Sequence, residues 1–188
     1  MAPAAWGSAL FFLIAPGLVA GVVPWFITRY TDPAELPVVL FGLVIVALGL
    51  AALVACFVQF VGEGRGTPAP VAPTEKLVVG GLYRWVRNPM YLAVGTIILG
   101  QAVAFASVGV LLWFGAITVA VVSFVTAYEE PTLRHTYGAS YDAYCGAVPA
   151  WRPRLTPWDG ASGSSAPTQT ASDQGRQAEC PPTRQRRQ

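Results

Sequence analysis

Two adjacent carboxylates, Glu129 and Glu130, follow a stretch from residue 89 to residue 128 that contains no charged side chain. Carboxylates bind cations and accept protons, so the pair is the first candidate for chemistry in this sequence. Like charges placed side by side at the end of an apolar run predict a positively charged partner. That partner is either a ligand or one of two arginines in the preceding polar stretch, Arg84 and Arg87.

Tyrosines occur close to these charges, and their pattern has two interpretations. The face of a tyrosine ring can stabilise a cation, which would add to a binding site. Aromatic side chains also gather at membrane boundaries without any catalytic role. Both interpretations apply to Tyr83, Tyr91, Tyr141 and Tyr144.

Metal and nucleic-acid chemistry are not expected. The three cysteines, Cys56, Cys145 and Cys180, form no CxxC motif, and the single histidine, His135, has no ligand spacing around it. A formal net charge of +2 gives no indication of a nucleic-acid partner. We therefore predict no metal and no nucleic acid among the partners.

The elements that position these residues are apolar and long. Hydrophobic residues make up 54% of the chain and charged residues 12%, against about 25% charged in an average soluble domain. Each apolar run is long enough to cross a hydrocarbon core about 30 Å thick as a helix. The runs extend over residues 5–27, 36–61, 89 to about 106, and 110–127, with a polar break at 107–109.

These runs predict an all-α integral membrane protein with about four transmembrane helices and a cytoplasmic, amphipathic C-terminal segment. We divide the chain into three parts. Residues 1–73 form an N-terminal two-helix membrane region with its loop, and residues 74–158 carry a helical hairpin and the candidate site. Residues 159–188 are a polar tail whose composition predicts disorder.

The distribution of positive charge predicts the orientation. The link after the first run holds one Lys or Arg, Arg29, whereas the link between the second and third runs holds Arg65, Lys76, Arg84 and Arg87. The positive-inside rule places the second link in the cytoplasm. Both termini are then cytoplasmic, and we expect an integral protein of a bacterial-type plasma membrane with membrane lipid around it.

The hairpin predicts a contact between residues that are distant in sequence. The third and fourth helices leave a shared turn near Ser107 and have similar lengths at 1.5 Å per residue, so their far ends emerge at one membrane face. We therefore expect Arg87, Asn88 and Tyr91 to lie near the 129–130 carboxylates.

Residues 81–91, GLYRWVRNPMY, resemble the signature of the isoprenylcysteine carboxyl methyltransferase family, which is related to the phospholipid methyltransferases. That signature has G-x-Y followed by R-H-P-x-Y at the start of a transmembrane helix. The second half of the family pattern resembles EEPTL at 129–133, YGASYDAY at 137–144, and the Pro/Arg-rich residues 149–154. The resemblance covers residues 74–154 and both halves occur at the family's separation.

The resemblance implies a pocket for S-adenosylmethionine that opens to the cytoplasm. The cofactor's cationic groups suit a carboxylate and tyrosine faces, and its carboxylate suits Arg87 or free N–H groups at a helix start. Catalysis is assigned to Glu130, as the base for an amine or hydroxyl acceptor, and to Arg87. The cofactor-binding positions are Glu75, Lys76, Leu77, Val78, Tyr83, Asn88, Pro89, Met90, Tyr91 and Glu129.

Two positions depart from the family pattern. Asn88 replaces the family histidine, and asparagine forms hydrogen bonds but does not take up a proton near neutral pH. Val125 stands where enzymes that act on prenylcysteine place an arginine for the substrate carboxylate. The lipid-soluble acceptor is therefore left open between a prenylcysteine-type carboxylate and a phospholipid-like amine.

These features predict a membrane-embedded methyltransferase that uses S-adenosylmethionine to methylate a lipid-soluble acceptor by in-line transfer. Two alternatives remain. Some membrane sterol reductases have a similar C-terminal region that binds a nicotinamide cofactor, which suggests an NADPH-dependent reductase. The changes at Asn88 and Val125 also fit a membrane protein that keeps the fold without its chemistry.

Overall fold

The computed structural model describes residues 15–64 and 77–160, and within these ranges every regular element is a helix. The N-terminal helix contains a π-helical segment, and a second such segment links α5 to α6. The elements are a π-helical segment Leu18–Val22, α2 Val23–Thr28, α3 Leu36–Gly64, a 3₁₀ turn Gly81–Arg84, α4 Pro89–Ala104, α5 Val108–Phe124, a π-helical segment Val125–Glu129, α6 Glu130–Tyr137 and α7 Ala139–Ala147.

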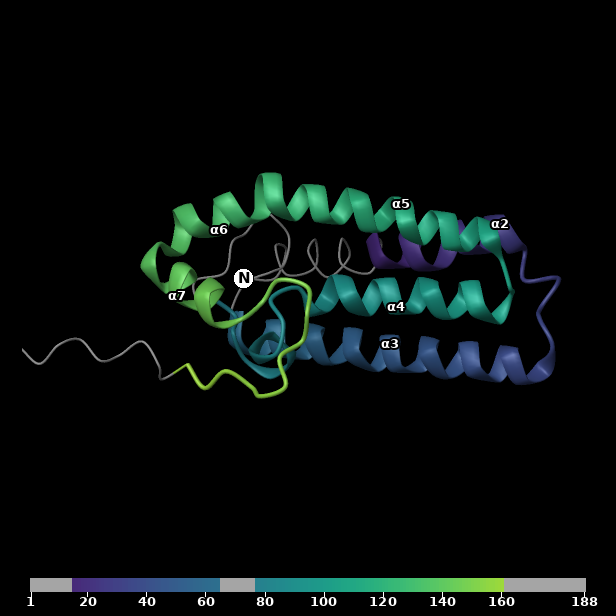
Figure 1. The fold of residues 1–188 in the computed structure, drawn as a ribbon, viewed down its shortest axis with the longest axis horizontal. Coiled ribbons are helices and arrows are strands. Elements are labelled where there is room, and N and C mark those ends of the chain that lie inside the picture. Colours follow the sequence, from purple (N-terminus) through teal and green to yellow (C-terminus); the bar gives the residue numbers. More distant parts are fainter. Residues whose placement is uncertain (1–14, 65–76, 161–188) are drawn as a thin grey trace, which may run out of the picture.

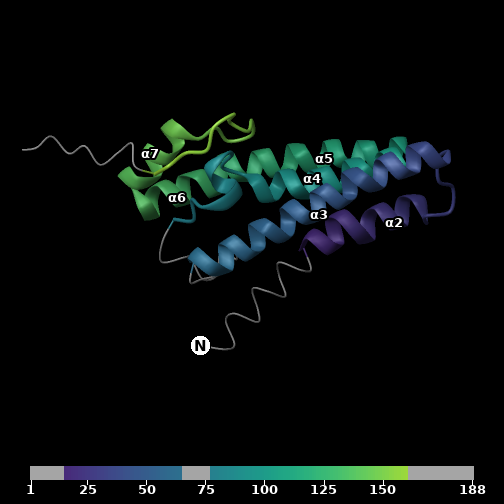
Figure 2. The same cartoon turned by 90° about the horizontal axis from the view of Figure 1, so that it is seen from below.

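Helices α3, α4 and α5 lie side by side, with α2 near one end of the bundle and α6 and α7 at the other (Figures 1 and 2). Among the described residues, two helical stretches are long and apolar enough to cross a membrane, Leu36–Gln59 and Val108–Tyr137. Two shorter apolar helices, Ala15–Thr28 and Pro89–Ala104, accompany them. The all-helical architecture agrees with the sequence, while four complete spans remain a prediction.

Glycines bring the backbones of α3 and α4 into direct contact. A Cβ atom added to Gly42 would lie 2.7 Å from the Gly100 carbonyl oxygen, and one added to Gly100 would lie 2.8 Å from the Gly42 carbonyl oxygen. A Cβ atom added to Gly49 would lie 2.8 Å from Cγ1 of Ile97 and 3.0 Å from the Ile97 amide nitrogen. In lipid, where helices gain little from burying apolar surface, such close approach supplies the attraction between them. Gly42 and Gly49 therefore mark the contact of α3 with α4.

The N-terminal helix carries a proline, and side chains from other helices satisfy the backbone groups that it frees. Pro24 has no N–H for the carbonyl of Ala20, four residues earlier, and Gln101 donates to that oxygen instead at 2.6 Å. The hydroxyl of Tyr30 donates to the Gln101 side-chain oxygen at 2.8 Å. The Trp113 indole donates to the Val19 carbonyl at 2.9 Å. Side chains on α4 and α5 thus provide hydrogen bonds to the helix at this proline.

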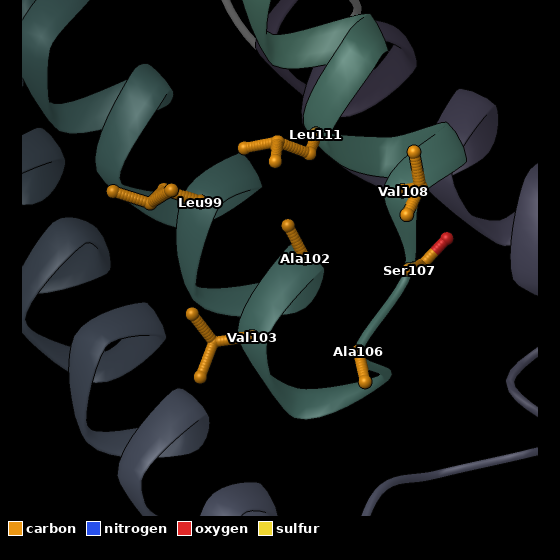
Figure 3. Close-up of a pocket in the computed structure, with 7 residues that line it drawn as sticks. All are labelled: Leu99, Ala102, Val103, Ala106, Ser107, Val108 and Leu111. Carbon is orange, nitrogen blue, oxygen red and sulfur yellow. The ribbon is translucent and has the colours of Figure 1, made fainter.

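The turn between α4 and α5 occurs where the sequence predicts it. Ser107 precedes α5, and its side-chain oxygen accepts a hydrogen bond from the Val110 amide at 3.3 Å, which caps the helix. A hollow of about 230 Å³ lies at this turn. Figure 3 shows apolar side chains of both helices around it, with Leu99 and Val103 on α4 and Leu111 on α5.

The expected end of the fourth helix near residue 127 is wrong. Helix α5 continues through the π-helical segment Val125–Glu129 directly into α6, so Glu129 and Glu130 do not stand at a helix C-terminus. Both carboxylates lie within a continuous helix, Glu129 at the end of the π-helical segment and Glu130 as the first residue of α6.

Candidate active site

Arg87 links the start of α4 to the C-terminal helices. Its Nη1 atom lies 3.0 Å from Oε1 of Glu130 on α6, 2.8 Å from Sγ of Cys145 and 3.5 Å from the hydroxyl of Tyr141, both on α7. The side chains of Arg87 and Glu130 are 15% and 22% exposed, so the ion pair is shielded from water on most sides. An ion pair in that setting positions its partners more firmly than an exposed one.

Tyr91 and Glu129 form the second contact between α4 and the hairpin's far end. The Tyr91 hydroxyl donates a hydrogen bond of 2.7 Å to Oε2 of Glu129. Together with the pair between Arg87 and Glu130, it confirms that residues forty positions apart meet at one end of the hairpin. The two adjacent carboxylates thus have different partners, a phenol for Glu129 and a guanidinium for Glu130.

A π-helical turn sets the directions of these two carboxylates. The amide of Glu130 donates to the carbonyl of Val125, five residues earlier, where an α-helix would use the carbonyl of residue 126. Pro131 follows, and its missing N–H could not have continued the α pattern at the next position. Single π turns of this kind occur frequently at functional sites.

Asn88 is held by the backbone of a later segment. Both its amide and its side-chain nitrogen donate to the carbonyl of Ala150, at 3.3 and 3.2 Å. The amide of Arg87 donates to the carbonyl of Pro149 at 3.0 Å. The Asn88 side chain, 8% exposed, therefore positions the chain immediately before α4.

Residues 149–158, here called the C-terminal strap, run along residues 84–88. Beyond the bonds to Arg87 and Asn88, the amide of Arg154 donates to the Trp85 carbonyl at 2.9 Å and that of Trp158 to the Arg84 carbonyl at 3.0 Å. Sequence reasoning noted a Pro/Arg-rich end here but not this pairing. Backbone hydrogen bonds do not depend on the type of side chain. The Pro/Arg-rich composition of this segment was therefore the only feature of the sequence that could indicate it.

Tyr144, a buried residue of α7, contacts the half-buried Tyr83 in the 3₁₀ turn Gly81–Arg84. The hydroxyl of Tyr144 donates to the carbonyl of Tyr83 at 2.7 Å. Burial raises the pKa of Tyr83 far above its ordinary value, and the acidic groups around it, Glu129 among them, raise the pKa further. Burial likewise raises the pKa of Tyr144. Both phenols therefore stay protonated near neutral pH, and that of Tyr144 serves as a hydrogen-bond donor.

The remaining predicted positions fall into three groups. Leu77 packs against the cluster formed by Tyr141, Tyr144 and Val148, and Val78 is buried at 7% exposure. Pro89 and Met90 occupy the first turn of α4, directly after Asn88. The positions Glu75 and Lys76 lie outside the described residues.

Two residues that reasoning from sequence did not assign to the site contact Arg87. Tyr141 was noted as an aromatic residue near the boundary and Cys145 as an unpaired thiol, yet both lie against the guanidinium. Their separation by four residues on α7 places them on one helix face, which was the signal available. Within residues 15–64 and 77–160, no three His, Cys, Asp or Glu side chains gather as metal ligands would.

A family model matches the part of the chain that carries most of these residues. The model described as phospholipid methyltransferase matches residues 37–140, which include α3 from its second residue, α4, α5 and both carboxylates. The chain belongs to the phospholipid methyltransferase family. No curated protein and no solved structure matches the chain.

Membership of the phospholipid methyltransferase family agrees with the resemblance seen in the signature residues. It assigns the chain to membrane methyltransferases, in keeping with the two apolar helices long enough to cross a membrane. The matched residues end at 140, so α7 and the C-terminal strap lie largely or wholly beyond them. The contacts of Arg87 with Cys145 and of Asn88 with Ala150 are thus features of this structure rather than of the family match.

Proposed function

We propose that this protein transfers a methyl group from S-adenosylmethionine to a lipid-soluble acceptor at the cytoplasmic membrane surface. The observation that carries the proposal is the convergence of Arg87, Asn88, Tyr91 and Glu129 at the start of α4. This convergence lies within or beside the segments that resemble the methyltransferase signature, and the chain belongs to a methyltransferase family.

The residues present fit the proposed cofactor. Arg87 Nε is buried and has no hydrogen-bond partner among the described residues, so the site holds a donor available to a carboxylate. Glu129 accepts a hydrogen bond from a neutral phenol, and its negative charge remains available to an ammonium or sulfonium group. A donor and a carboxylate side by side match a ligand that carries both signs of charge.

Each residue has a role in this proposal. S-adenosylmethionine supplies a methyl group activated by a sulfonium, which passes to the acceptor's lone pair. Arg87 and Asn88 orient the ligand at the start of α4, and Glu129 with Tyr91 balances its positive charge. For an amine acceptor, Glu130 is the proposed base, since the Arg87 guanidinium positions its carboxylate at 3.0 Å.

The surroundings of the site favour an amine acceptor over a carboxylate. Val125, where prenylcysteine enzymes would place an arginine, is 2% exposed and offers no charge. Arg87 is already paired with Glu130. A second carboxylate brought to this membrane boundary would lack a cation, which is costly in an apolar environment.

The proposed topology has four spans with both termini in the cytoplasm. The two shorter apolar helices, Ala15–Thr28 and Pro89–Ala104, supply the spans beyond the two long ones. The site then lies on the cytoplasmic side, at the end of the bundle that carries α6 and α7 (Figure 1). Substituted-cysteine labelling from each side of a membrane vesicle tests this orientation: a residue of the 29–35 link should react only from outside.

The decisive experiment is calorimetric titration of detergent-solubilised protein with S-adenosylhomocysteine. We expect binding in the wild type, weakened about tenfold to 150-fold in Glu129→Gln, because a hydrogen bond to a charged group contributes about 1.5–3 kcal/mol. Glu35→Gln is the matched control, since Glu35 is exposed in the link between α2 and α3 and lies outside the site. Its affinity should equal that of the wild type.

Absence of binding in wild-type protein that unfolds cooperatively would refute the proposal. NADPH would then be titrated, and binding of NADPH alone would support a reductase instead. Equal loss of affinity in Glu129→Gln and Glu35→Gln would also contradict the assignment of Glu129.

A further inference from the structure

The C-terminal strap leaves one apolar side chain almost completely uncovered. Leu155 is 96% exposed, more than any other large apolar side chain among the described residues. The next most exposed, Leu112 at 70% and Leu36 and Val108 at 69%, lie on α5 and α3, the two helices long and apolar enough to cross a membrane. Such exposure is thus a property of the lipid-facing helices, and Leu155 shares it on a segment without regular structure.

Contacts on both sides of Leu155 hold this part of the strap in place. The amide of Arg154 donates to the Trp85 carbonyl at 2.9 Å. Three residues after the leucine, the Trp158 ring packs against that of Tyr144, with the ring centroids 5.4 Å apart. The strap is therefore fixed to the protein before and after Leu155, so the exposure of this side chain does not come from a loose loop.

The strap meets the helices on a side of the bundle that faces lipid. Pro153, two residues before Leu155, lines a groove between α3 and α4 together with Leu48, which is 64% exposed on a helix long enough to span the bilayer. Figure 1 shows the strap, in yellow-green, beside the ends of α3 and α4. Its bond to Trp85, four residues before α4 begins at Pro89, sets its level. Leu155 therefore adjoins a surface that contacts lipid, at the height where α4 begins.

The residues next to Leu155 are of the types found at membrane boundaries. Arg152 is exposed and forms no ion pair with a described side chain. An arginine can reach from an apolar surface to the head groups, and anionic head groups attract its charge. An apolar side chain and an exposed cation on one fixed segment match the edge of the hydrocarbon and the head groups of a lipid leaflet.

We infer that Leu155 inserts among the lipid chains of the adjacent leaflet, with Arg152 at the head groups, so that the C-terminal strap is a membrane-contacting element. This inference goes beyond the proposed function and does not depend on it. The same strap accepts the backbone hydrogen bonds of Arg87 and Asn88. The membrane contact therefore also steadies the chain immediately before α4.

Quenching by lipid tests the insertion directly. Leu155→Cys, labelled with an environment-sensitive nitrobenzoxadiazole probe, is placed in nanodiscs of phosphatidylcholine and phosphatidylglycerol, with or without lipid that is spin-labelled near the head end of its chain. We expect blue-shifted emission and strong quenching by the spin-labelled lipid. Ser140→Cys is the matched control, since Ser140 is exposed on α7, beyond the ends of α3 and α4 (Figure 1), and its probe should stay unquenched. Wild-type protein carried through the same labelling gives the contribution of the native cysteines.

Hydrogen exchange measures the effect on the strap without turnover. Leu155→Asp in nanodiscs should speed exchange of the Arg154 and Trp158 amides about tenfold or more, the factor expected when the burial of one leucine is lost. Because Leu155 is almost fully exposed, the substitution removes almost no contact within the protein, so such a change comes from the membrane. Leu155→Met and Ser140→Asp should both keep the wild-type exchange.

Strong quenching at position 155 together with faster exchange in Leu155→Asp supports the inference. Quenching no greater than at position 140 overturns it. Blue-shifted emission without quenching also overturns it, because another protein surface would then cover Leu155. Equal exchange in Leu155→Asp and the wild type overturns the link between the membrane contact and the strap. None of these results concerns S-adenosylhomocysteine binding, so the proposed function is tested separately by its own titration.

Discussion

Gly100→Ala is expected to destabilise the helix bundle, because α3 leaves no room for a methyl group at this position. The added Cβ would lie 2.8 Å from the Gly42 carbonyl oxygen and 2.8 Å from both the amide nitrogen and Cγ2 of Val46. Two of these three atoms belong to the backbone of α3, so a side-chain rotation cannot relieve the contact. The two helices must move apart instead.

The expected size follows from two opposing contributions. Forcing a methyl group into a filled contact costs about 1–3 kcal/mol. Replacing glycine by alanine within a helix contributes about 1 kcal/mol in the stabilising direction. The net loss in the free energy of unfolding for Gly100→Ala is therefore about 1 kcal/mol.

Gly115→Ala isolates the packing contribution. Gly115 lies within α5, and a Cβ atom added there meets nothing within 4 Å, so this variant should gain about 1 kcal/mol. The two variants should differ by about 2 kcal/mol, which corresponds to roughly 4–8 °C in the unfolding midpoint of a chain this size. Tryptophan fluorescence during thermal unfolding in one detergent measures that difference.

A Gly100→Ala protein as stable as Gly115→Ala, or more stable, would refute the reasoning. It would mean that α3 and α4 do not meet backbone to backbone at Gly42 and Gly100. The sign of the difference is the decisive quantity, because both variants are the same chemical change in a helix interior.

Three further outcomes are expected. Gln101→Leu should lower the free energy of unfolding by about 1–3 kcal/mol, since the Ala20 carbonyl loses its buried donor; a midpoint equal to the wild type in thermal unfolding would contradict this. Gly138→Ala should lower the free energy of unfolding by about 1–3 kcal/mol, because the φ of 53° and ψ of −128° at this residue suit glycine. A Cβ there meets no atom within 4 Å, so backbone strain alone causes the loss. Unchanged stability in thermal unfolding would show that the turn relaxes freely. Tyr91→Phe should weaken S-adenosylhomocysteine binding in calorimetry about tenfold through loss of the Glu129 hydrogen bond, and wild-type affinity would argue against a role for that bond.

The helical architecture and the central contacts follow from features that a sequence displays. Uninterrupted apolar runs predicted helices whose starts at Leu36 and Pro89 agree with the structure. Equal helix lengths on either side of Ser107 predicted that Tyr91 would approach Glu129, which the 2.7 Å hydrogen bond confirms. Both inferences depend on helix geometry, which is nearly independent of the detailed sequence.

Other features could not be predicted because they depend on backbone groups. The C-terminal strap pairs through the carbonyls of Pro149 and Ala150, and any residue type supplies a carbonyl. The π-helical turn before Pro131 replaces one backbone pairing by another, so the sequence predicted a helix end where the helix continues. The contact between Arg87 and Cys145 depends in turn on where α7 packs.

The π-helical turn at 125–129 also has a consequence for insertions and deletions. A π turn contains one residue more than an α turn, so the helix absorbs an extra residue there without interrupting its axis. Removing one residue from this turn would restore α pairing and leave the residues beyond it facing nearly the same way, whereas α pairing of all the residues now present would rotate everything beyond the turn by about 100°. Glu130 would then turn away from Arg87 while every apolar residue of α5 kept its place. The length of this one turn, rather than the identity of its residues, sets the direction in which the Glu130 carboxylate points relative to α5.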